Sequence, residues 1–385
     1  SILVTTSPPI GGMVGWFISL IRRIPFNFWV MDLNPDQAIA QGVVGPKSLP
    51  ARIFDFFNRR LLKRASRVIA LDEFMAANVR KKTPNLDDKI LVIPPWPLEQ
   101  ALEIIPRDKN PFLKKHQLED KFVLMYSGNH SPVHPLDTFL DTAKALANDE
   151  RFVFLFIGGG KGKQAVDDFI ASKEPGHIVS LPYQALDQIK YSLSAADIHL
   201  VSMGAPMIGC VHPCKFYGSM LLAKPILYLG PPDSHIGKII EETDAGWQID
   251  HGETAKMIEV IKTASQDPTL VSIGEKGRQK ILSSLSKKQF ALNFAKRSPP
   301  IRLNDSLLTT AFFVALAISL LLTRIMIRLG PKLGLIDEPG ERRIHVKPVP
   351  RAGGIAVFLT FVITVFAVQS FSELSGQLSF KWFKA

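Results

Sequence analysis

Cysteine is scarce in this sequence of 385 residues, which contains only Cys210 and Cys214. Two thiols cannot form the disulfide framework of a small secreted domain, and so few are typical of a reducing compartment. Both common glycine-rich nucleotide fingerprints are also missing, because the run GGGKGK at 158–163 has neither the Walker nor the dinucleotide spacing. These absences exclude a disulfide scaffold and a P-loop nucleotide hydrolase.

Acidic residues are in deficit, with 35 Asp and Glu against 46 Lys and Arg, which gives a net charge of +11. Such an excess suits an anionic partner such as nucleic acid, nucleotide phosphates or an acidic membrane surface, although a plain solvated surface explains part of it. No recognised nucleic-acid motif and no interleaved stripe of basic and aromatic residues is present. We therefore expect no nucleic-acid partner.

Long apolar runs are confined to the end of the chain. Residues 306–323 are 18 residues without a charge, and residues 353–368 are 16 more. The first meets the lower limit for a membrane span, and the second is marginal unless it extends to Phe371. Two such runs outside any α/β pattern favour membrane insertion over buried core helices. The shorter apolar stretch 10–21 is predicted to be a packed helix of a soluble domain.

Short β-rich segments alternate with helical ones between residues 121 and 272. The predicted strands are 122–126, 152–157, 177–181, 197–201, 225–229 and 247–249. The predicted helices include 136–148, 163–172, 185–195 and 213–223. This alternation predicts βαβ units and hence an α/β fold with a parallel, doubly wound sheet.

The same alternation occurs earlier, but with fewer strands, at 2–6, 26–31, 67–71 and 89–93. We expect a partial Rossmann-like domain that lacks its beginning, since Ser1 stands directly before a strand with no initiator Met or signal peptide. The Pro-rich segment 94–111 is predicted to link the two domains.

Ligands bind outside the carboxyl ends of the strands in such sheets. After 122–126, Gly128 permits close backbone approach, and Ser127, Asn129, His130 and His134 offer polar groups. After 152–157, the glycines 158–160 could expose N–H groups beside Lys161 and Lys163, although a plain tight turn is equally compatible. Pro213 suits the first position of a helix whose free N–H groups and Lys215 would bind a phosphate. The alternative for Lys215 is a surface lysine.

Taken together, the runs YSGNHSPVHPLDTFLDTAKAL, FLFIGGGKGK, LPYQALDQIKYSLSAADIHLV and HPCKFYGSMLLAKPILYLGP resemble the donor domain of family 4 glycosyltransferases, in the branch that builds colanic acid, O-antigen and related bacterial exopolysaccharides. TTSPP, MDLNPDQAIAQG and RASRVIALDEFM are similar to the acceptor domain, so the resemblance covers about residues 1–297. It implies a GT-B fold, in which two Rossmann-like domains face a cleft.

The resemblance also implies a division of the chain. Its parts would be a partial acceptor-side domain at 1–93, a linker at 94–120, a nucleotide-sugar domain at 121–272, a closing helix (287–298) and linker within 273–302, and a transmembrane fragment at 303–385.

Donor contacts are carried over from the family by position. The implied donor-binding residues are Ser127, Gly128, Asn129, Gly159, Gly160, Lys161, Leu181, Pro182, Tyr217 and Gly218. The chain departs from the family at two places: Asn129 and His134 stand where many members have Arg and Lys, and Gly218 stands where many have Glu. Positive charge from Lys161, Lys163 and Lys215 could compensate.

The family transfers a sugar with retention and usually without a metal, and no pair of carboxylates for double displacement is visible. Catalysis would rest on positioning and on positive charge that stabilises the departing diphosphate, with His134 and Lys215 in that role. Asp32 either orients the acceptor or caps a helix. The run CVHPC at 210–214 lacks a fourth zinc ligand, so we expect neither metal nor cofactor.

The segment 330–358 resembles the first cytoplasmic loop and second-helix start of polyprenyl-phosphate N-acetylhexosamine-1-phosphate transferases. The residues that carry the match are Asp337, Pro339, His345, Pro348, Pro350, Gly353 and Gly354. The catalytic aspartates of that family belong to later helices, which this chain does not reach. The segment is strongly basic, which favours the cytoplasmic side and contact with anionic lipid.

These observations predict a hexosyltransferase at the cytoplasmic face of the inner membrane, anchored through its C-terminal part. It would move a sugar from a nucleotide diphosphate sugar to a lipid-linked glycan in surface polysaccharide synthesis. Two alternatives stay open: a non-catalytic subunit that binds nucleotide or polyprenyl lipid, and a fragment of a bifunctional transferase. If both apolar runs span, a cytoplasmic basic loop conflicts with a cytoplasmic enzyme. Either the first run does not span, or the large domain does not follow the charge rule, or the chain is a truncated fusion that can lack activity. We favour the last explanation.

Overall fold

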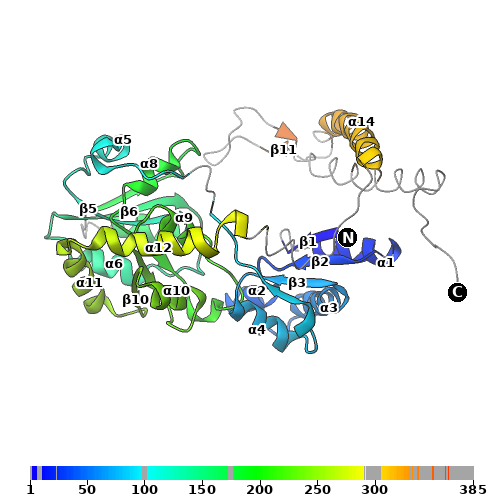
Figure 1. The fold of residues 1–385 in the computed structure, drawn as a ribbon, viewed down its shortest axis with the longest axis horizontal. Helices are drawn as coiled ribbons and strands as arrows, with labels where there is room; N and C mark the ends of the chain where they lie inside the picture. Colours follow the sequence, from blue (N-terminus) through cyan, green and yellow to red (C-terminus); the bar gives the residue numbers. More distant parts are fainter. Residues whose placement is uncertain are drawn as a thin grey trace. The chain divides into compact units, whose positions relative to one another are not determined.

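The computed structural model describes residues 2–6, 11–22, 24–97, 102–171, 177–289, 291 and 305–329, together with 332, 336–337, 349–350, 360 and 363. The chain divides into two compact units, Ser1–Pro299 and Pro300–Ala385. The first unit holds two parallel sheets with helices between successive strands (Figure 1). The predicted α/β fold with two Rossmann-like sheets is confirmed.

The first sheet has four parallel strands in the order β1-β2-β3-β4. Their bounds are β1 Ile2–Thr5, β2 Phe26–Trp29, β3 Arg67–Ala70 and β4 Ile90–Val92. The connecting helices are α1 Gly11–Arg22, α2 Asp36–Ala40, α3 Leu49–Arg64 and α4 Glu73–Lys82, with a 3-10 turn at Asp87–Lys89. Phe26, Phe28 and Val68 lie fully buried in the core that these elements enclose.

Helix α1 is the apolar stretch predicted to pack in a soluble domain, and its existence is confirmed. A Cβ on Gly15 would lie 2.4 Å from a methyl carbon of Val4, so the glycine lets the helix lie close to β1. Trp16 meets the edge of Phe57 on α3 at 5.9 Å between ring centroids. The face of α1 that carries Phe17 is exposed to solvent.

The second sheet has six parallel strands in the order β10-β9-β8-β5-β6-β7. Their bounds are β5 Phe122–Asn129, β6 Phe152–Gly159, β7 Ile178–Leu181, β8 Ile198–Ser202, β9 Ile226–Leu229 and β10 Gly246–Ile249. The helices are α5 Pro111–Lys115, α6 Asp137–Ala145, α7 Lys163–Ala171, α8 Ile189–Ser194, α9 Lys215–Leu221, α10 His235–Thr243, α11 Thr254–Gln266 and α12 Leu270–Ser284, with 3-10 turns at Arg107–Lys109 and Ala205–Met207. The strand order reverses between β5 and β8, and doubly wound sheets bind ligands at such a point.

The structure corrects two predicted boundaries at this edge of the sheet. Strands β5 and β6 continue to Asn129 and Gly159, because Gly128 pairs with Gly158 and extends the ladder beyond the apolar segments. Helix α9 begins at Lys215 with Cys214 as its N-cap, so Pro213 precedes the helix instead of opening it.

Direct hydrogen bonds join the two domains of the first unit. The N–H of Leu33 donates to the carbonyl of Cys210 at 2.8 Å, and the Asn78 amide donates to the carbonyl of Ile208 at 3.1 Å. Both acceptors lie in the segment between β8 and α9. The loop that leads into the Lys215 helix is therefore held by the first domain.

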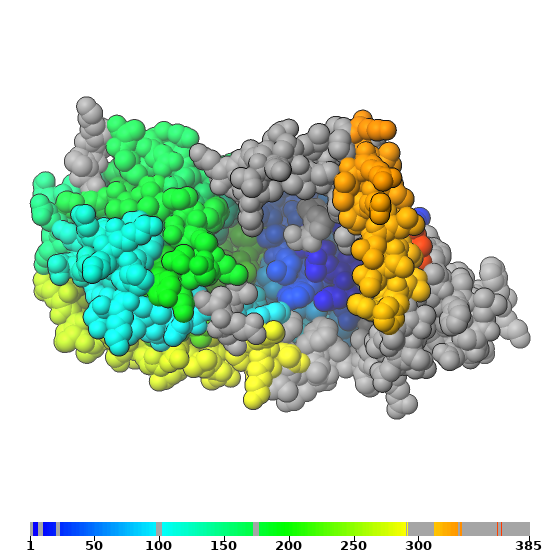
Figure 2. Space-filling model, turned by 90° about the horizontal axis from the view of Figure 1, so that it is seen from above, coloured from blue at the N-terminus to red at the C-terminus, as the bar shows by residue number. Residues whose placement is uncertain are grey.

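The second unit contains the helix α14, Asp305–Leu329, and the short antiparallel pair β11, Ile336–Asp337, and β12, Val349–Pro350. Residues Phe312–Leu329 are long and apolar enough to cross a membrane. Figure 2 shows α14 in orange, with side chains exposed along the visible face of the helix. The first predicted span lies in this helix.

Several predictions for the end of the chain fall outside the described residues. Of the second apolar run only Thr360 and Ile363 are described, and of the predicted closing helix only 287–289 and 291. Asp337 lies in β11, whereas Pro339, His345, Gly353 and Gly354 are outside the described part.

Substitution of Gly274 tests the packing of α12 on the second sheet. Alanine in a helix interior normally stabilises relative to glycine, but a Cβ at Gly274 would lie 1.9 Å from the backbone oxygen of Ala223. We expect Gly274→Ala to destabilise the chain by about 1–3 kcal/mol, as overpacking does. The control is Ser283→Ala on the exposed face of the same helix, which should shift stability by less than about 0.5 kcal/mol. Thermal unfolding of the full chain in detergent measures both, and an unchanged midpoint for Gly274→Ala would contradict the packing.

Candidate functional site

A cavity of about 370 Å³ opens at the carboxyl edge of the second sheet, beside the strand-order reversal. Its walls come from the end of β5, the loop after β7, helices α8 and α9, and the interdomain linker. The residues that line it include Trp96, Ser127, Gly128, Tyr183, Gln184, Cys214, Lys215 and Gly218. Four residues predicted for donor binding or catalysis, Ser127, Gly128, Lys215 and Gly218, thus lie around one cavity. Among its described lining residues there is no Asp or Glu.

Three glycines, Gly128, Gly158 and Gly160, form the part of this site that we call the glycine floor. Gly128, Gly158 and Gly160 have φ values of +135°, +130° and +128°, which disfavour other residues. A Cβ on Gly158 would lie 2.0 Å from the carbonyl oxygen of Gly128, and one on Gly160 would lie 2.4 Å from that of His130. The carboxyl ends of β5 and β6, with the residues that follow them, therefore touch backbone to backbone.

Lys215 lies over this glycine floor. The Cβ position of Gly128 is 3.5 Å from the Lys215 Nζ, and the ammonium sits 3.9 Å from the centroid of the Tyr126 ring, to whose hydroxyl it donates. No carboxylate of a described residue forms an ion pair with it. Desolvation by burial lowers the pKa of Lys215 from its ordinary value to about 7. The amine is thus held where a diphosphate group would find an unneutralised cation.

Two histidines stand beside Lys215 and carry no charge at neutral pH. Burial, with the nearby lysine charges, lowers the pKa of His134 to about 3 and that of His130 to about 4. The Nδ1 of His134 lies 2.6 Å from the carbonyl oxygen of Ser202 at the end of β8, so the neutral ring donates there. In this state Lys215, and not His134, supplies positive charge.

The other predicted donor residues lie around the cavity or away from it. Asn129 and Lys161 are exposed, Gly159 is buried, and Leu181 is half-buried. The carbonyl of Pro182 accepts a hydrogen bond from Gln184.

Tyr217 does not line the cavity. Its ring is fully buried, and its hydroxyl contacts His212 and His235 instead. Gly218 does line it, and a Cβ there would meet Leu102 of the linker at 3.3 Å.

Sequence reasoning missed most of the lining residues, among them Tyr183, Gln184 and Trp96. Tyr183 donates to the carbonyl of Gly159 at 3.1 Å and thereby ties the loop after β7 to the glycine floor. Gln184 follows it, and Trp96, from the linker, stacks with Trp29 at 6.1 Å. The aromatic and amide pair directly after a strand end was the available signal for the first two.

Asp32 lies across from this site, at the carboxyl end of β2. The N–H groups of Met31 and Asp32 both donate to the Thr6 hydroxyl, at 2.9 and 3.0 Å. Helix α2 has Pro35 as its N-cap with no side-chain capping bond, so the helix-capping alternative for Asp32 is wrong. Burial raises the pKa of Asp32. The pKa of the Cys214 thiol is raised to about 11, first by desolvation and second by the negative charge of Asp32. The Asp32 carboxylate therefore lies near the residue that precedes Lys215.

A buried chain of hydrogen bonds crosses between the two domains. Asp72 Oδ2 lies 2.6 Å from His212 Nδ1, and His212 Nε2 lies 2.8 Å from the Tyr217 hydroxyl, which is 3.0 Å from His235 Nε2. Asp72 also caps α4 by accepting from Met75 N–H at 2.7 Å. Burial raises the pKa of Asp72, but the bond from His212, the charges of His212 and His235 and the bond from the Met75 N–H together keep the pKa below the ordinary value.

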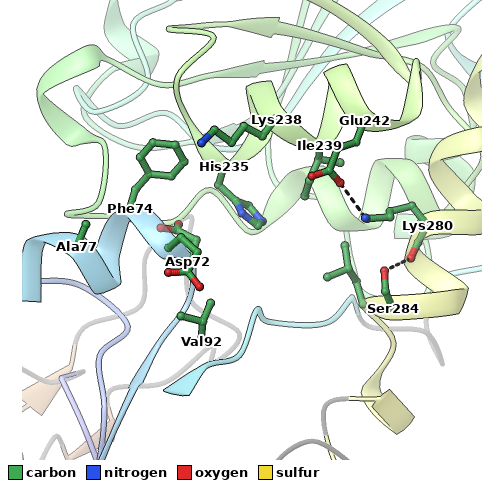
Figure 3. A pocket seen from close by; sticks show the side chains of 12 residues that line it. Asp72, Phe74, Ala77, Val92, His235, Lys238, Ile239, Glu242, Lys280 and Ser284 are labelled. Atoms are coloured by element: carbon green, nitrogen blue, oxygen red, sulfur yellow. Dashed lines mark hydrogen bonds and ion pairs between the residues drawn. The ribbon is translucent and has the colours of Figure 1, made fainter. Parts of the chain in front are cut away.

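A second cavity, of about 530 Å³, adjoins this series of hydrogen bonds (Figure 3). Asp72, Phe74 and Val92 enter it from the first domain, opposite α10 and α12 of the second. The Lys238 ammonium lies 4.8 Å from the centroid of the Phe74 ring. Lys280 and Glu242 form an ion pair at 2.9 Å on the far wall. The cavity marks the seam between the domains.

The cysteines and His212 do not assemble a metal site. Cys210 is buried, whereas Cys214 is exposed. His212 uses both ring nitrogens within the interdomain chain. No group of three or more His, Cys, Asp or Glu side chains suited to a metal occurs in the part of the chain that the structure describes.

Comparison with known proteins gives a family match for part of the chain. Residues 1–96 match the model of the glycosyl transferase 4-like domain. The chain is 27% identical over 222 residues to a probable glycosyltransferase, WbjE, of Pseudomonas aeruginosa, a match that covers 57% of this chain and 55% of that protein. It is 38% identical over 66 residues to a probable undecaprenyl-phosphate N-acetylglucosaminyl 1-phosphate transferase of Bacillus subtilis, which covers 17% of this chain and 18% of that protein. The chain spans about half or less of the curated relatives it matches.

Several solved structures share the fold of this chain at low sequence identity. HepE of Anabaena, in complex with UDP and glucose, has a TM-score of 0.63 at 16% identity, covering 76% of each chain. Sucrose-phosphate synthase of Thermosynechococcus elongatus has a TM-score of 0.60 at 13% identity, covering 74% of this chain and 70% of the synthase. WaaG, a glycosyltransferase involved in lipopolysaccharide biosynthesis, has a TM-score of 0.57 at 14% identity, covering 74% of this chain and 80% of WaaG. The first unit of this chain thus has the GT-B fold, and residues 1–96 carry the match to a glycosyl transferase 4-like domain.

Proposed function

We propose that the chain is a retaining glycosyltransferase that moves a sugar from a nucleotide diphosphate sugar to a lipid-linked glycan in surface polysaccharide synthesis. One observation carries the proposal: the desolvated Lys215 amine lies directly over the backbone of Gly128 at the edge of the 370 Å³ cavity. This arrangement, a cation above a side-chain-free backbone, suits a diphosphate. The relatives WbjE and HepE support the reaction class and the donor class.

We place the donor in the cavity in one orientation. In this proposal the diphosphate lies on the glycine floor under Lys215, and the base lies toward Tyr183 and Gln184 near the loop 181–182. HepE is described in complex with UDP and with UDP-glucose, which makes a uridine donor the first to test. Gly218 leaves no carboxylate for the ribose, so binding rests more on the diphosphate.

The chemistry follows from the charges around the cavity. Cleavage of the sugar–phosphate bond releases a nucleoside diphosphate, and protonated Lys215 stabilises the negative charge that develops on it. Neutral His134 donates from Nδ1 to the Ser202 carbonyl, which leaves its Nε2 to accept one hydrogen bond beside it. We assign Asp32 the role of orienting the acceptor hydroxyl. Because no carboxylate of a described residue lines the cavity, a covalent glycosyl-carboxylate intermediate has no support, and retention would proceed on one face of the sugar.

The acceptor and the location rest on the second unit. Helix α14 is apolar enough to hold the chain at a membrane, and the Bacillus relative is named for a lipid-carrier reaction. We therefore place the acceptor on a polyprenyl-type lipid and the enzyme on the cytoplasmic face, where nucleotide sugars are made. The division at 1–93, 94–120, 121–272, 273–302 and 303–385 is part of this proposal.

The direct test is turnover by the full chain in lipid nanodiscs. A panel of radiolabelled UDP- and GDP-sugars is supplied with a bacterial lipid-linked glycan extract, and transfer of label to lipid is measured. NMR of the product then reports the anomeric configuration, which should equal that of the donor. Saturable nucleotide binding without transfer to any acceptor would instead identify a non-catalytic binding subunit.

Lys215→Met separates function from folding. Methionine fills a similar volume without a charge to desolvate, and the Tyr126 hydroxyl keeps its bond to the Asn129 carbonyl. We expect the thermal midpoint to rise, with a gain of about 1–2 kcal/mol, while UDP binding by calorimetry is lost. The control Lys161→Met, at an exposed position of the next loop, should leave stability unchanged and weaken UDP binding only slightly. A less stable Lys215→Met, or one that still binds UDP, would contradict this account.

The pH dependence of donor binding reports the Lys215 pKa. UDP-glucose binds the protonated amine and has no diphosphate group that titrates between pH 6 and 9. Because the pKa of free Lys215 is about 7, affinity should be constant below that pH and fall above it, by up to about tenfold per pH unit. Lys215→Arg, which stays charged, should give a flat profile. A flat profile in the parent protein would show that Lys215 does not hold the diphosphate.

A further inference from the structure

The wall of the 370 Å³ cavity is apolar beside helix α9. Gly218 comes three residues after Lys215, so both residues lie on one face of the helix, and both line the cavity. The Cβ position of Gly218 lies 3.3 Å from a terminal methyl carbon of Leu102. Leu102 belongs to the interdomain linker, lines the same cavity and packs against a core cluster of the second domain. A leucine methyl group thus stands where a longer side chain at position 218 would begin.

The cavity offers a nucleotide one cation and neutral groups. Among its described lining residues, Lys215 is the one charged side chain. Two of the hydroxyl groups already donate their hydrogens within the protein, Tyr183 to the Gly159 carbonyl and Ser192 to the Ile189 carbonyl, each at 3.1 Å. The described part of the wall therefore suits a diphosphate but holds no charged acceptor for the hydroxyl groups of a pentose.

A ribose differs from a 2′-deoxyribose by one hydroxyl group, which loses bound water when the nucleotide enters a site. Nucleotide sites on doubly wound sheets commonly offset this loss with an Asp or Glu that accepts a hydrogen bond from the hydroxyl. A site built to bond a substrate hydroxyl rejects the analogue without it by up to about 10⁴–10⁵-fold. An apolar wall has the opposite preference, because burial of a hydroxyl without a partner is unfavourable.

The donor orientation proposed above sets the pentose against this apolar wall. The diphosphate lies under Lys215 and the base lies toward Tyr183, so the pentose that joins them passes Gly218 and Leu102. Three aliphatic side chains that follow Tyr183 in the chain line the same cavity: Leu186, Ile189 and Leu193. They give the base end a surface for the 5-methyl group by which thymine differs from uracil.

We propose that this cavity takes 2′-deoxyribonucleoside diphosphate sugars at least as well as ribonucleoside ones, and thymidine diphosphate sugars before uridine diphosphate sugars. Gly218 and Leu102 determine this specificity. Gly218 supplies no acceptor for a 2′-hydroxyl, and Leu102 places a methyl group beside the carbon that would carry it. The inference rests on the proposed function, because it names the donor class of that same site.

Four nucleotides separate the two features in a binding experiment. Calorimetry of the full chain in lipid nanodiscs compares UDP, 2′-deoxy-UDP, 5-methyl-UDP and thymidine diphosphate, which differ only in the 2′-hydroxyl and the 5-methyl group. We expect 2′-deoxy-UDP to bind as tightly as UDP or up to about tenfold more tightly. The 5-methyl group should tighten binding by about fourfold in either pair, as burial of one methyl group does.

The outcomes separate this inference from the function on which it rests. A 2′-deoxy-UDP that binds threefold or more weakly than UDP would overturn the inference and leave the proposed function intact, because a nucleotide is still bound. Weaker binding of both 5-methyl nucleotides would refute the preference for thymidine. A chain that binds none of the four nucleotides would refute the inference and the proposed function together.

An engineered ribose contact tests the roles of Gly218 and Leu102. Gly218→Glu combined with Leu102→Ala puts a carboxylate beside the pentose and removes the methyl carbon that a Cβ at position 218 approaches. We expect this variant to prefer UDP over 2′-deoxy-UDP by about tenfold or more, as a hydrogen bond to a charged group does. The ratio of the two dissociation constants cancels any general effect of the new charge on the diphosphate.

The matched control is Gly218→Gln combined with Leu102→Ala, which has the same shape without the charge and should give a smaller preference for UDP. Thermal unfolding confirms that both variants are folded. A folded Glu variant with the same ratio as the parent would place the pentose elsewhere and refute the assignment to these two residues. The nucleotide series in the parent chain decides the inference even where a variant does not fold.

Discussion

The backbone contact between the carboxyl ends of β5 and β6 is the constraint on which the rest of the site depends. The Gly128 carbonyl lies where any Cβ on Gly158 would have to be, and the His130 carbonyl lies where one on Gly160 would be. Only glycine allows the ends of β5 and β6 to meet this closely. The meeting leaves a floor without side chains, and Lys215 occupies the space above it.

The burial of the Lys215 amine lowers the stability of the folded chain. A desolvated amine with no carboxylate partner among the described residues costs free energy, and its lowered pKa reports that cost. The bond to the Tyr126 hydroxyl and the ring beneath the ammonium offset part of it. His134 and His130 stay neutral mainly because they are buried, and the positive charge of Lys215 lowers their pKa further. Strained or desolvated groups of this kind concentrate at functional sites.

Helix α9 links this site to the other domain. Lys215 reaches the glycine floor from its first turn, while Tyr217, two residues on, reaches the buried chain that ends at Asp72. Asp72 in turn caps α4 of the first domain. One short helix thus carries a cavity residue and an interdomain contact.

The sequence by itself determined the strands of both sheets, because runs such as FVLMY and FVFLFI have the apolar and β-branched or aromatic content of buried parallel strands. The loops that follow the predicted strands 122–126 and 152–157, with the segment that leads into Lys215, also pointed to one edge of the sheet as the site. Tertiary structure alone decided which side chains converge there. Tyr183 and Trp96 enter from distant segments, Tyr217 turns toward His212, and the burial that lowers the Lys215 pKa comes from packing. Local patterns report which residues are apolar, but distance and desolvation depend on neighbours that only the folded chain brings together.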